Sequence, residues 1–293
     1  MSHGSEASQD RVTPAPDSTA VRTALWRAMR VEHDAAPHVF TDEVGLALVA
    51  PEDDGWRARP DMHPQWTRTF RAAMVARARF IEELVEREAA RGVDQYVILG
   101  AGLDTFAHRR PELASRLQVF EVDRPAPQAW KAQRLRALGF EVPAWLHLVP
   151  VDFEAGASWW DELVRAGFDP ARPAVVVSTG VTMYLSRDAI AATLRQVAAL
   201  AAGSTLAMTF MLPVELLAPE DRQAFEWAQQ GAAASGTPFA TVLAPHDVLA
   251  LARAAGFATA THVSGPSLAD RYFAGRADGL RPSTGEDFLV ATT

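Results

Sequence analysis

Hydrophobic positions along this chain follow two periods, one typical of helices and one typical of buried strands. An apolar residue recurs every three or four positions from Phe70 to Val85, with Met74, Ala78 and Ile81 between them. This spacing places the five side chains on one face of a helix. We expect that helix to be the second of two that precede the first strand.

Short apolar runs between turn-forming residues predict seven strands. The runs cover residues 95–99, 118–123, 146–151, 174–178, 205–211, 257–263 and 287–291. Helices are expected between them, one carrying Trp130 and Arg134 and another over 246–256. A further helix starts at a Ser186 cap and is expected to end at Gly203. This alternation predicts a doubly wound α/β sheet that binds its ligand at the carboxyl ends of the strands.

Composition narrows the function classes. Apolar residues make up 48% of the chain and charged residues 22%, as in ordinary globular proteins, and the net charge of −8 argues against non-specific nucleic-acid binding. The chain has no cysteine, which excludes disulfides and thiolate metal sites and fits the cytoplasm, where we expect it. The uncharged run 197–214 approaches the length of a membrane span, but Gly203 and Pro213 break it, so a helix end followed by a buried strand explains it better.

The loop Gly100-Ala101-Gly102 follows the first strand and carries the first sign of a ligand site. Glycines there allow a tight turn and close approach of the backbone to a ligand, although a plain turn would need them too. Asp123 ends the second strand, 21 positions after Gly102, where a carboxylate can accept both ribose hydroxyls. Asp152 ends the third strand and is followed by Phe153, a pair suited to adenine. Three such strand ends together predict an adenosine site.

Two adenosine ligands fit these residues. A dinucleotide normally needs a third glycine at the helix start, but Thr105 stands there and Asp104 adds negative charge near the phosphates. The zwitterionic tail of S-adenosylmethionine fits better, with Asp104 facing its ammonium and Arg77 or Arg79 its carboxylate. A nicotinamide oxidoreductase and a cofactor-binding protein without activity remain as alternatives.

Several segments resemble the leucine carboxyl methyltransferase family, which includes bacterial methyltransferases of natural-product pathways. The segments are 96–109, 120–125 with Lys131, 149–153, 166–170 and 183–185, and the similarity runs in register from about residue 20 to 211. The resemblance implies a Rossmann-like class I methyltransferase, with seven mostly parallel strands and helices on both faces. After a disordered tail over 1–20, it implies one domain over 21–293. Its parts are a helical arm (21–92), a cofactor-binding core (93–213), a lid insertion (214–245) and the rest of the core (246–293).

The resemblance also implies site residues. It places Arg77 on the methionyl carboxylate, Gly100 and Gly102 along the methionyl backbone, Asp123 on the ribose, and Asp152 with Phe153 at the adenine. The complete cofactor set that we expect is Arg77, Gly100, Ala101, Gly102, Asp104, Asp123, Arg124, Asp152, Phe153 and Thr179. Arg109 would brace the glycine loop.

Two positions depart from the family pattern. Thr179 stands where a glutamate is common near the methionine moiety, and Asp104 is the candidate to replace its charge. Glu154 stands where carboxyl methyltransferases have an arginine that helps to hold the substrate carboxylate. An acid there would repel a carboxylate, so we expect a hydroxyl acceptor.

These observations predict an S-adenosylmethionine-dependent O-methyltransferase for a small hydrophobic acceptor, with no nucleic-acid or membrane partner. Tyr184, beyond the fourth strand, is the candidate catalytic residue that could bond the acceptor oxygen. His108 and His246 are better explained as a helix-surface residue and a residue at a helix start. No metal is expected, because His33 and His38 lack a second ligand cluster.

Overall fold

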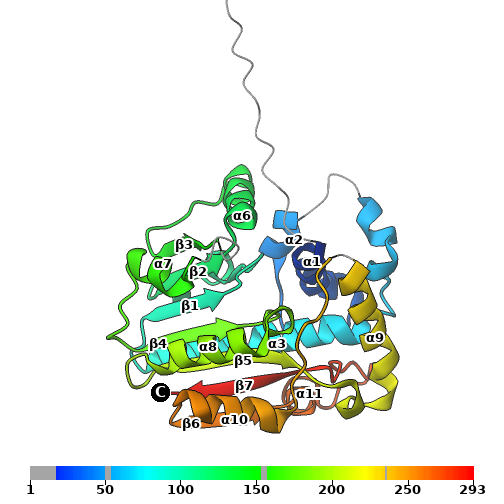
Figure 1. Ribbon diagram of the computed structural model, residues 1–293. Coiled ribbons are helices and arrows are strands. Elements are labelled where there is room, and N and C mark those ends of the chain that lie inside the picture. Colours follow the sequence, from blue (N-terminus) through cyan, green and yellow to red (C-terminus); the bar gives the residue numbers. More distant parts are fainter. Residues whose placement is uncertain (1–17, 50–53, 153–156, 235) are drawn as a thin grey trace, which may run out of the picture.

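The computed structural model describes residues 18–49, 54–152, 157–234 and 236–293, and its centre is a seven-stranded sheet (Figure 1). The strands are β1 Gln95–Leu99, β2 Gln118–Asp123, β3 Leu146–Pro150, β4 Ala174–Ser178, β5 Thr205–Met211, β6 Thr259–Val263 and β7 Glu286–Thr292. Their order is β3-β2-β1-β4-β5-β7-β6. Strands β1 to β5 are parallel, and β7 lies antiparallel between β5 and β6. The mostly parallel α/β sheet predicted from the sequence is confirmed.

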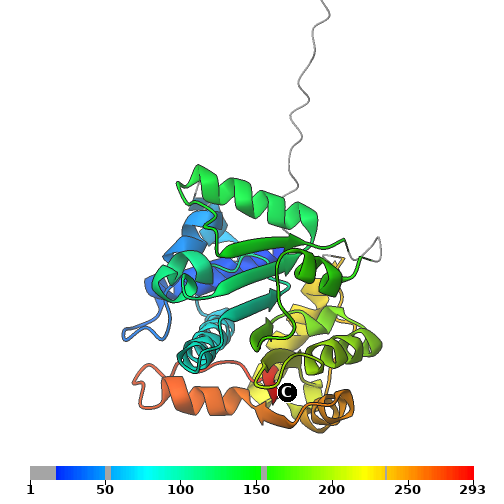
Figure 2. The same cartoon turned by 90° about the vertical axis from the view of Figure 1, so that its left-hand side faces the viewer.

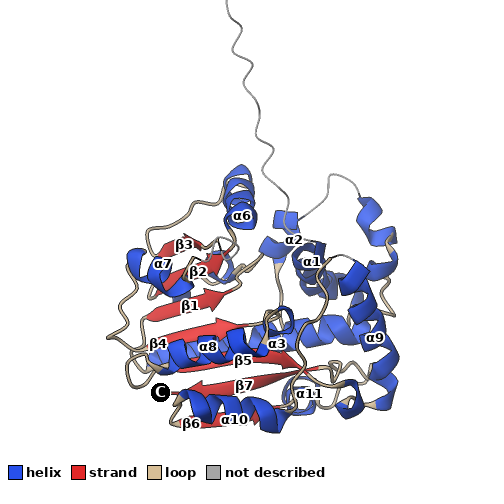
Figure 3. Ribbon diagram, viewed as in Figure 1, coloured by secondary structure: helices blue, strands red, loops and turns tan. Residues whose placement is uncertain are grey.

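Helices cover both faces of this sheet, as the turned view in Figure 2 shows. They are α1 Ser18–His33, α2 Glu43–Val49, α3 Arg68–Ala90, α4 Phe106–Arg109, α5 Pro111–Ala114, α6 Pro125–Ala137, α7 Trp159–Arg165, α8 Arg187–Ala198, α9 Pro219–Ala234, α10 Pro245–Ala255 and α11 Gly265–Phe273. Figure 3 colours these helices blue, the strands red and the loops tan. No helix in the described part of the chain combines the length and apolar composition that a membrane crossing requires.

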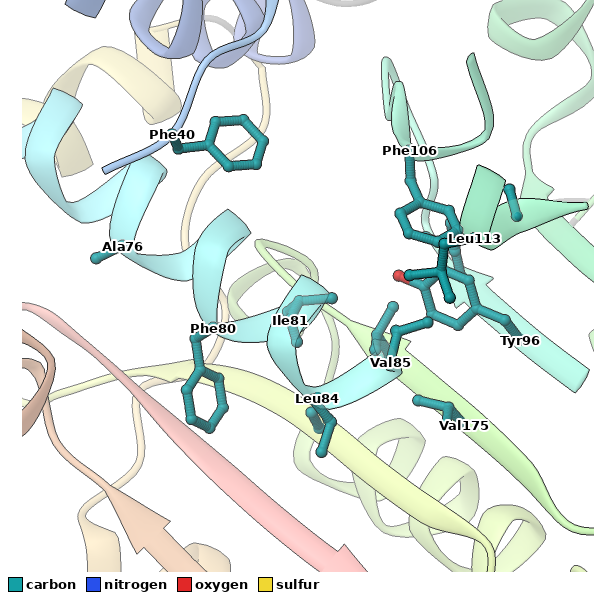
Figure 4. Packing of buried hydrophobic residues seen from close by; sticks show 14 of the residues in the cluster. Phe40, Ala76, Phe80, Ile81, Leu84, Val85, Tyr96, Phe106, Leu113 and Val175 are labelled. Carbon is teal, nitrogen blue, oxygen red and sulfur yellow. The ribbon is translucent and has the colours of Figure 1, made fainter. Parts of the chain in front are cut away.

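Alternate residues of each strand enter two different cores, because successive side chains point to opposite faces of a sheet. Tyr96 and Ile98 of β1 join the core under α3 and α11, where the ring of Phe80 of α3 lies tilted against that of Phe288 of β7. Figure 4 shows Tyr96 together with Phe80 and Leu84 of α3 in this core. Val97 and Leu99 enter the core under α7, α8 and α10. Burial on both faces explains why the central strands are continuous apolar runs in the sequence.

The N-terminal helices form a third, smaller core beyond the carboxyl ends of the parallel strands (Figure 1). Leu25 and Met29 of α1 and Leu48 of α2 pack there with Leu103, which directly follows the glycine loop. The N-terminal helices therefore pack directly against the residue that follows the glycine loop.

Some expected boundaries were wrong. Helix α1 begins at Ser18, so the end of the expected tail is helical. Helix α8 ends at Ala198, and Gly203, with φ of 89°, lies in the turn before β5 instead of capping the helix. Helix α11, which the sequence did not predict, fills the connection from β6 to β7, because its apolar face completes the core under α3.

Candidate functional site

The glycine loop after β1 is shaped by its contact with the loop after β4. Gly100 and Gly102 have positive φ values of 72° and 49°, which favour glycine. A Cβ on Gly100 would lie 2.5 Å from a methyl carbon of Val181, so a larger residue would push the two loops apart. The amides of Gly100 and Ala101 both donate to the carbonyl oxygen of Val122, at 2.9 and 3.1 Å, which ties the loop to the end of β2.

Asp123 lies at the carboxyl end of β2 and is bonded to the glycine loop. Its Oδ2 accepts from the amide of Gly102 at 2.5 Å, and its Oδ1 accepts from the amide of Arg124 at 2.7 Å. Each carboxylate oxygen has a further lone pair with which it can accept a ribose hydroxyl. Arg124 itself is exposed at the start of α6.

The third predicted strand end is only partly described. Asp152 is exposed just after β3, on the same edge of the sheet as Asp123. Phe153 and Glu154 lie outside the described residues, so their predicted parts at the adenine and against a carboxylate substrate stay predictions.

A polar cavity opens beside the glycine loop and brings Arg77, Asp104 and Thr179 together. The other residues that line it come from the arm, α3, β1, β4 and α4: Arg27, Phe40, Met74, Ala78, Ile81, Glu82, Tyr96, Ile98, Thr105, Phe106, Arg109 and Val177. Arg79 does not line this cavity, and its guanidinium pairs with Glu83 at 2.7 Å. The structure thus favours Arg77 over Arg79 as the cation for a carboxylate ligand.

Arg77 is held at the cavity by two neighbours that sequence analysis missed. Its Nη1 donates to both carboxylate oxygens of Glu286, at 3.0 and 3.1 Å. Its guanidinium also lies against Gly180, where an added Cβ would come within 3.2 Å of Nη1. The loop carrying Gly180 is fixed by Thr209 of β5, whose hydroxyl accepts from the Gly180 amide at 2.8 Å.

The arm is bonded to the glycine loop through Asp42. This buried carboxylate accepts from Arg27 at 2.9 Å and from the hydroxyl of Thr105 at 2.8 Å, while Arg27 also donates to the carbonyl of Leu103 at 2.8 Å. Burial raises the pKa of Asp42, but Arg27 and the hydrogen bonds from Thr105 and Gly45 outweigh it and hold that pKa below its usual value.

Arg109 and Asp104 make further contacts between α3, the arm and the start of α4 beside the polar cavity. Arg109 pairs with Glu82 of α3 and stacks 4.2 Å over the ring of Phe40. Oδ1 of Asp104 accepts from the amide of Phe106 at 2.8 Å, so Asp104 both stabilises the start of α4 and lines the cavity.

A second cavity, mainly apolar, lies under the predicted lid. It is lined by Phe70, Ala73, Met74, Met211, Leu217, Asp221, Phe225, Ser283, Gly285 and Glu286. Met74 lines both cavities, so they are neighbours on α3. Asp221 anchors α9 here by accepting from Arg281 at 2.9 and 3.0 Å and from the hydroxyl of Thr284 at 2.9 Å.

The remaining candidates lie elsewhere. Tyr184 is half-buried and packs edge-on against Phe239, with ring centres 5.9 Å apart, and it lines neither cavity. Its predicted catalytic part stays a prediction. His108 faces the carbonyl oxygen of Glu141 at 3.1 Å, and His246 is exposed beside Asp247 at the start of α10. Among the residues that the structure describes, no three His, Asp or Glu side chains gather as metal ligands would.

Known proteins resemble this chain in sequence and in fold. The profile of the family described as leucine carboxyl methyltransferase matches residues 20–198. The chain belongs to this family. A Bacillus subtilis relative named "Putative S-adenosyl-L-methionine-dependent methyltransferase YktD" is 34% identical over 207 residues, which are 70% of this chain and 67% of that protein.

Two crystal structures share the fold over nearly the whole chain. A DUF574 family protein from Streptomyces avermitilis has a TM-score of 0.61 at 18% identity and covers 95% of this chain and 98% of its own. A protein from Thermobifida fusca, titled a putative methyltransferase, has a TM-score of 0.59 at 20% identity and covers 95% of both chains. The fold is that of a class I methyltransferase.

Membership makes this protein an S-adenosylmethionine-dependent methyltransferase, and the described residues fit that cofactor. Arg77 and Asp104 line one cavity with the opposite charges that a zwitterionic amino-acid tail requires. The carboxylate of Asp123 stands at the adjoining strand end, bonded to Gly102 of the loop between them. The described residues thus offer charged partners suited to the amino-acid tail and a carboxylate suited to the ribose.

Proposed function

We propose that this protein methylates a hydroxyl oxygen of a small hydrophobic acceptor, of the kind found among phenolic and enolic natural products. The observation that carries the proposal is the apolar cavity under α9, which adjoins the polar cavity and shares Met74 with it. Phe70, Leu217 and Phe225 give this cavity an aromatic and aliphatic lining that suits an apolar ring.

Each part of the site has a distinct task in this proposal. Arg77, Asp104 and Thr179 would hold the amino-acid tail of the cofactor, and Asp123 and Asp152 its adenosine end. The cofactor, when bound, supplies an activated methyl group. The chain's own contribution is to orient the acceptor oxygen and to keep water out, for which the lid helix α9 and its Asp221 anchor are suited.

The acceptor class is tested with the purified protein and S-adenosylmethionine carrying an isotopically labelled methyl group. Phenols, enols and aliphatic alcohols are compared with carboxylic acids of the same carbon skeleton. We expect label in the hydroxyl compounds, in a form that survives mild base, because ethers resist base and methyl esters hydrolyse. Label that appears only in the acids and is lost in base would overturn the proposal.

Carboxyl methylation is the second candidate, and the family match itself favours it, since the matching profile is that of leucine carboxyl methyltransferases. The two acids that line the apolar cavity, Asp221 and Glu286, weigh against a carboxylate acceptor. Both acids are paired with arginines, which reduces that repulsion. Mild base therefore decides between the two acceptors, because it removes the label from a methyl ester and not from an ether.

Replacing Asp123 with alanine tests the adenosine end. We expect Asp123→Ala to weaken binding of S-adenosylhomocysteine by about tenfold to a hundredfold, because hydrogen bonds to a charged group contribute roughly 1.5–3 kcal/mol. The Gly102 amide also loses its acceptor, which adds to the effect. Isothermal titration calorimetry measures the affinity, with the exposed Asp270→Ala of α11 as the control. An affinity unchanged from the wild type would mean that the adenosine lies elsewhere.

A further inference from the structure

Glu286 stands at the junction of the two cavities although it lies more than a hundred residues beyond the glycine loop. Because β7 runs antiparallel to β5, the first residue of β7 meets the last residue of β5, and Glu286 pairs in register with Met211. This reversal brings Glu286 to the same edge of the sheet as the carboxyl ends of the parallel strands. From there it lines the apolar cavity and reaches Arg77, which lines the polar one.

Glu286 contacts only one of the three guanidinium nitrogens of Arg77. Both hydrogen bonds to Glu286 leave from Nη1, and among the described residues Nε and Nη2 of Arg77 have no hydrogen-bond partner. Neither of these two nitrogens is among the buried unpaired polar atoms of the described part of the chain, so both remain accessible. Nε and Nη2 form the edge of a guanidinium that binds a carboxylate through two parallel hydrogen bonds.

The pair is also sheltered from water. The side chains of Arg77 and Glu286 are only 14% and 11% exposed, and Gly180 lies against the guanidinium. An arginine on a surface helix loses considerable conformational entropy when it is fixed in one rotamer. A carboxylate that already holds Nη1 fixes the rotamer before any ligand arrives, so less entropy is lost on binding.

We propose that Glu286 is the positioning residue for Arg77 and that it thereby sets the affinity for the amino-acid tail of the cofactor. This inference rests on the proposed cofactor site. Nη1 of Arg77 donates to Glu286, and its Nε and Nη2 donate to the carboxylate of the tail. Glu286 is not displaced when the ligand binds.

Two opposing electrostatic effects of Glu286 nearly cancel. Its charge repels the carboxylate of the tail, but it attracts the ammonium of the same zwitterion, so the net Coulomb effect on a neutral tail is small. The orienting effect on Arg77 has no such counterpart and decides the outcome. A ligand without the amino-acid tail would feel neither effect.

The test compares two ligands on one substitution. Glu286→Gln keeps the size of the side chain and one acceptor oxygen but removes the charge that holds Nη1. We expect it to bind S-adenosylhomocysteine about tenfold more weakly than the wild type, because a neutral acceptor holds Nη1 less firmly and the hydrogen bonds of Arg77 to the tail weaken. Its affinity for 5′-methylthioadenosine, which has the adenosine but no amino-acid tail, should stay within twofold. The control is Glu226→Gln, the same chemical change at an exposed position of α9.

Each other outcome identifies a different failure. Tighter binding of S-adenosylhomocysteine would show that Glu286 competes with the ligand, and unchanged binding would show that Arg77 is oriented without it. Equal weakening of both ligands would show general damage to the site, and all three results overturn the inference. A wild-type protein that binds neither ligand would instead overturn the cofactor site on which the inference rests.

Discussion

At the scale of single residues, the site depends on two glycines whose lack of a side chain leaves room for a neighbour. Gly100 leaves room for Val181, and Gly180 leaves room for the guanidinium of Arg77. Other glycines with positive φ, such as Gly139 at 81°, have no atom within 4 Å of an added Cβ. A positive φ alone therefore does not show that a contact depends on the missing Cβ, and the neighbouring atoms must be compared as well.

Gly180→Ala should act on the ligand's tail through Arg77. Its Cβ would come within 3.2 Å of Nη1, so the guanidinium must shift by a few tenths of an ångström. We expect S-adenosylhomocysteine to bind about tenfold more weakly while 5′-methylthioadenosine is little affected. Alanine at positive φ also costs roughly 1 kcal/mol of stability. Gly139→Ala carries the same backbone cost without the contact and serves as the matched control in calorimetry and thermal unfolding. If both variants bind S-adenosylhomocysteine alike, Gly180 has no special part in the site.

At the scale of elements, strand β2 and helix α6 are joined by a buried ion pair. Nζ of Lys131 lies 2.6 Å from Glu121, and each side chain is 1% exposed. Gln128 of the same helix turn donates to the backbone carbonyl of Glu121 at 2.7 Å. Because Asp123 ends the same strand, this pair helps to fix the strand end that carries the predicted ribose ligand.

Removing one partner of this pair should be costly. Lys131→Met leaves the charge of Glu121 buried without its cation, for which we expect a loss of about 3–5 kcal/mol in the free energy of unfolding at neutral pH. Burial already raises the pKa of Glu121 although Lys131 opposes it, and without Lys131 the pKa rises further. A folded-state pKa above the unfolded one means that protonation favours the folded state, so the deficit of Lys131→Met should shrink as the pH falls below neutral.

Urea unfolding at two pH values measures both effects. Adding Glu121→Gln to Lys131→Met removes the buried charge and should restore part of the stability. A single variant that loses less than about 1 kcal/mol would show that the pair is not an essential contact between β2 and α6.

At the scale of the whole molecule, the N-terminal arm and the sheet form one unit around the glycine loop. Asp42 lies before α2, yet it binds Thr105 after the loop and Arg27 of α1. Leu103 adds an apolar contact between the same parts. Folding of the arm and shaping of the ligand site are thus coupled.

Asp42→Asn should therefore lower stability and ligand affinity together. At neutral pH we expect a loss of about 2–4 kcal/mol in the free energy of unfolding, because the substitution removes the buried carboxylate that pairs with Arg27. We also expect weaker binding of S-adenosylhomocysteine. The pKa of Asp42 is lowered in the folded state, so its contribution is complete above about pH 4 and is lost as the pH falls through the lower folded-state value. The difference between variant and wild type should shrink over that acidic range.

Urea unfolding from pH 7 downward measures this difference, with the exposed Asp270→Asn of α11 as the control. A full loss of stability with unchanged ligand affinity would show that the arm stabilises the fold without shaping the site.

The sequence by itself determined the strands, most of the helices and which polar residues stand at the strand ends. The central strands were predictable because parallel strands buried on both faces are mainly apolar, as 174–178 and 205–211 are apart from Ser178, Thr205 and Thr209. Helix α11 was missed, since its apolar face has meaning only beside α3. The position of Gly203 was misjudged because the residues after a helix can turn in several ways before the next strand.

Only the tertiary structure decided which polar residues share a cavity. Local patterns indicate where a strand ends, so Asp123 and the glycine loop could be found from the chain alone. Glu286, Gly180 and Asp42 could not be found, because each acts on a residue far along the chain that only strand order and direction bring near. The choice of Arg77 over Arg79 has the same cause: both lie on one helix, but only Arg77 faces the loop after β4 and the start of β7.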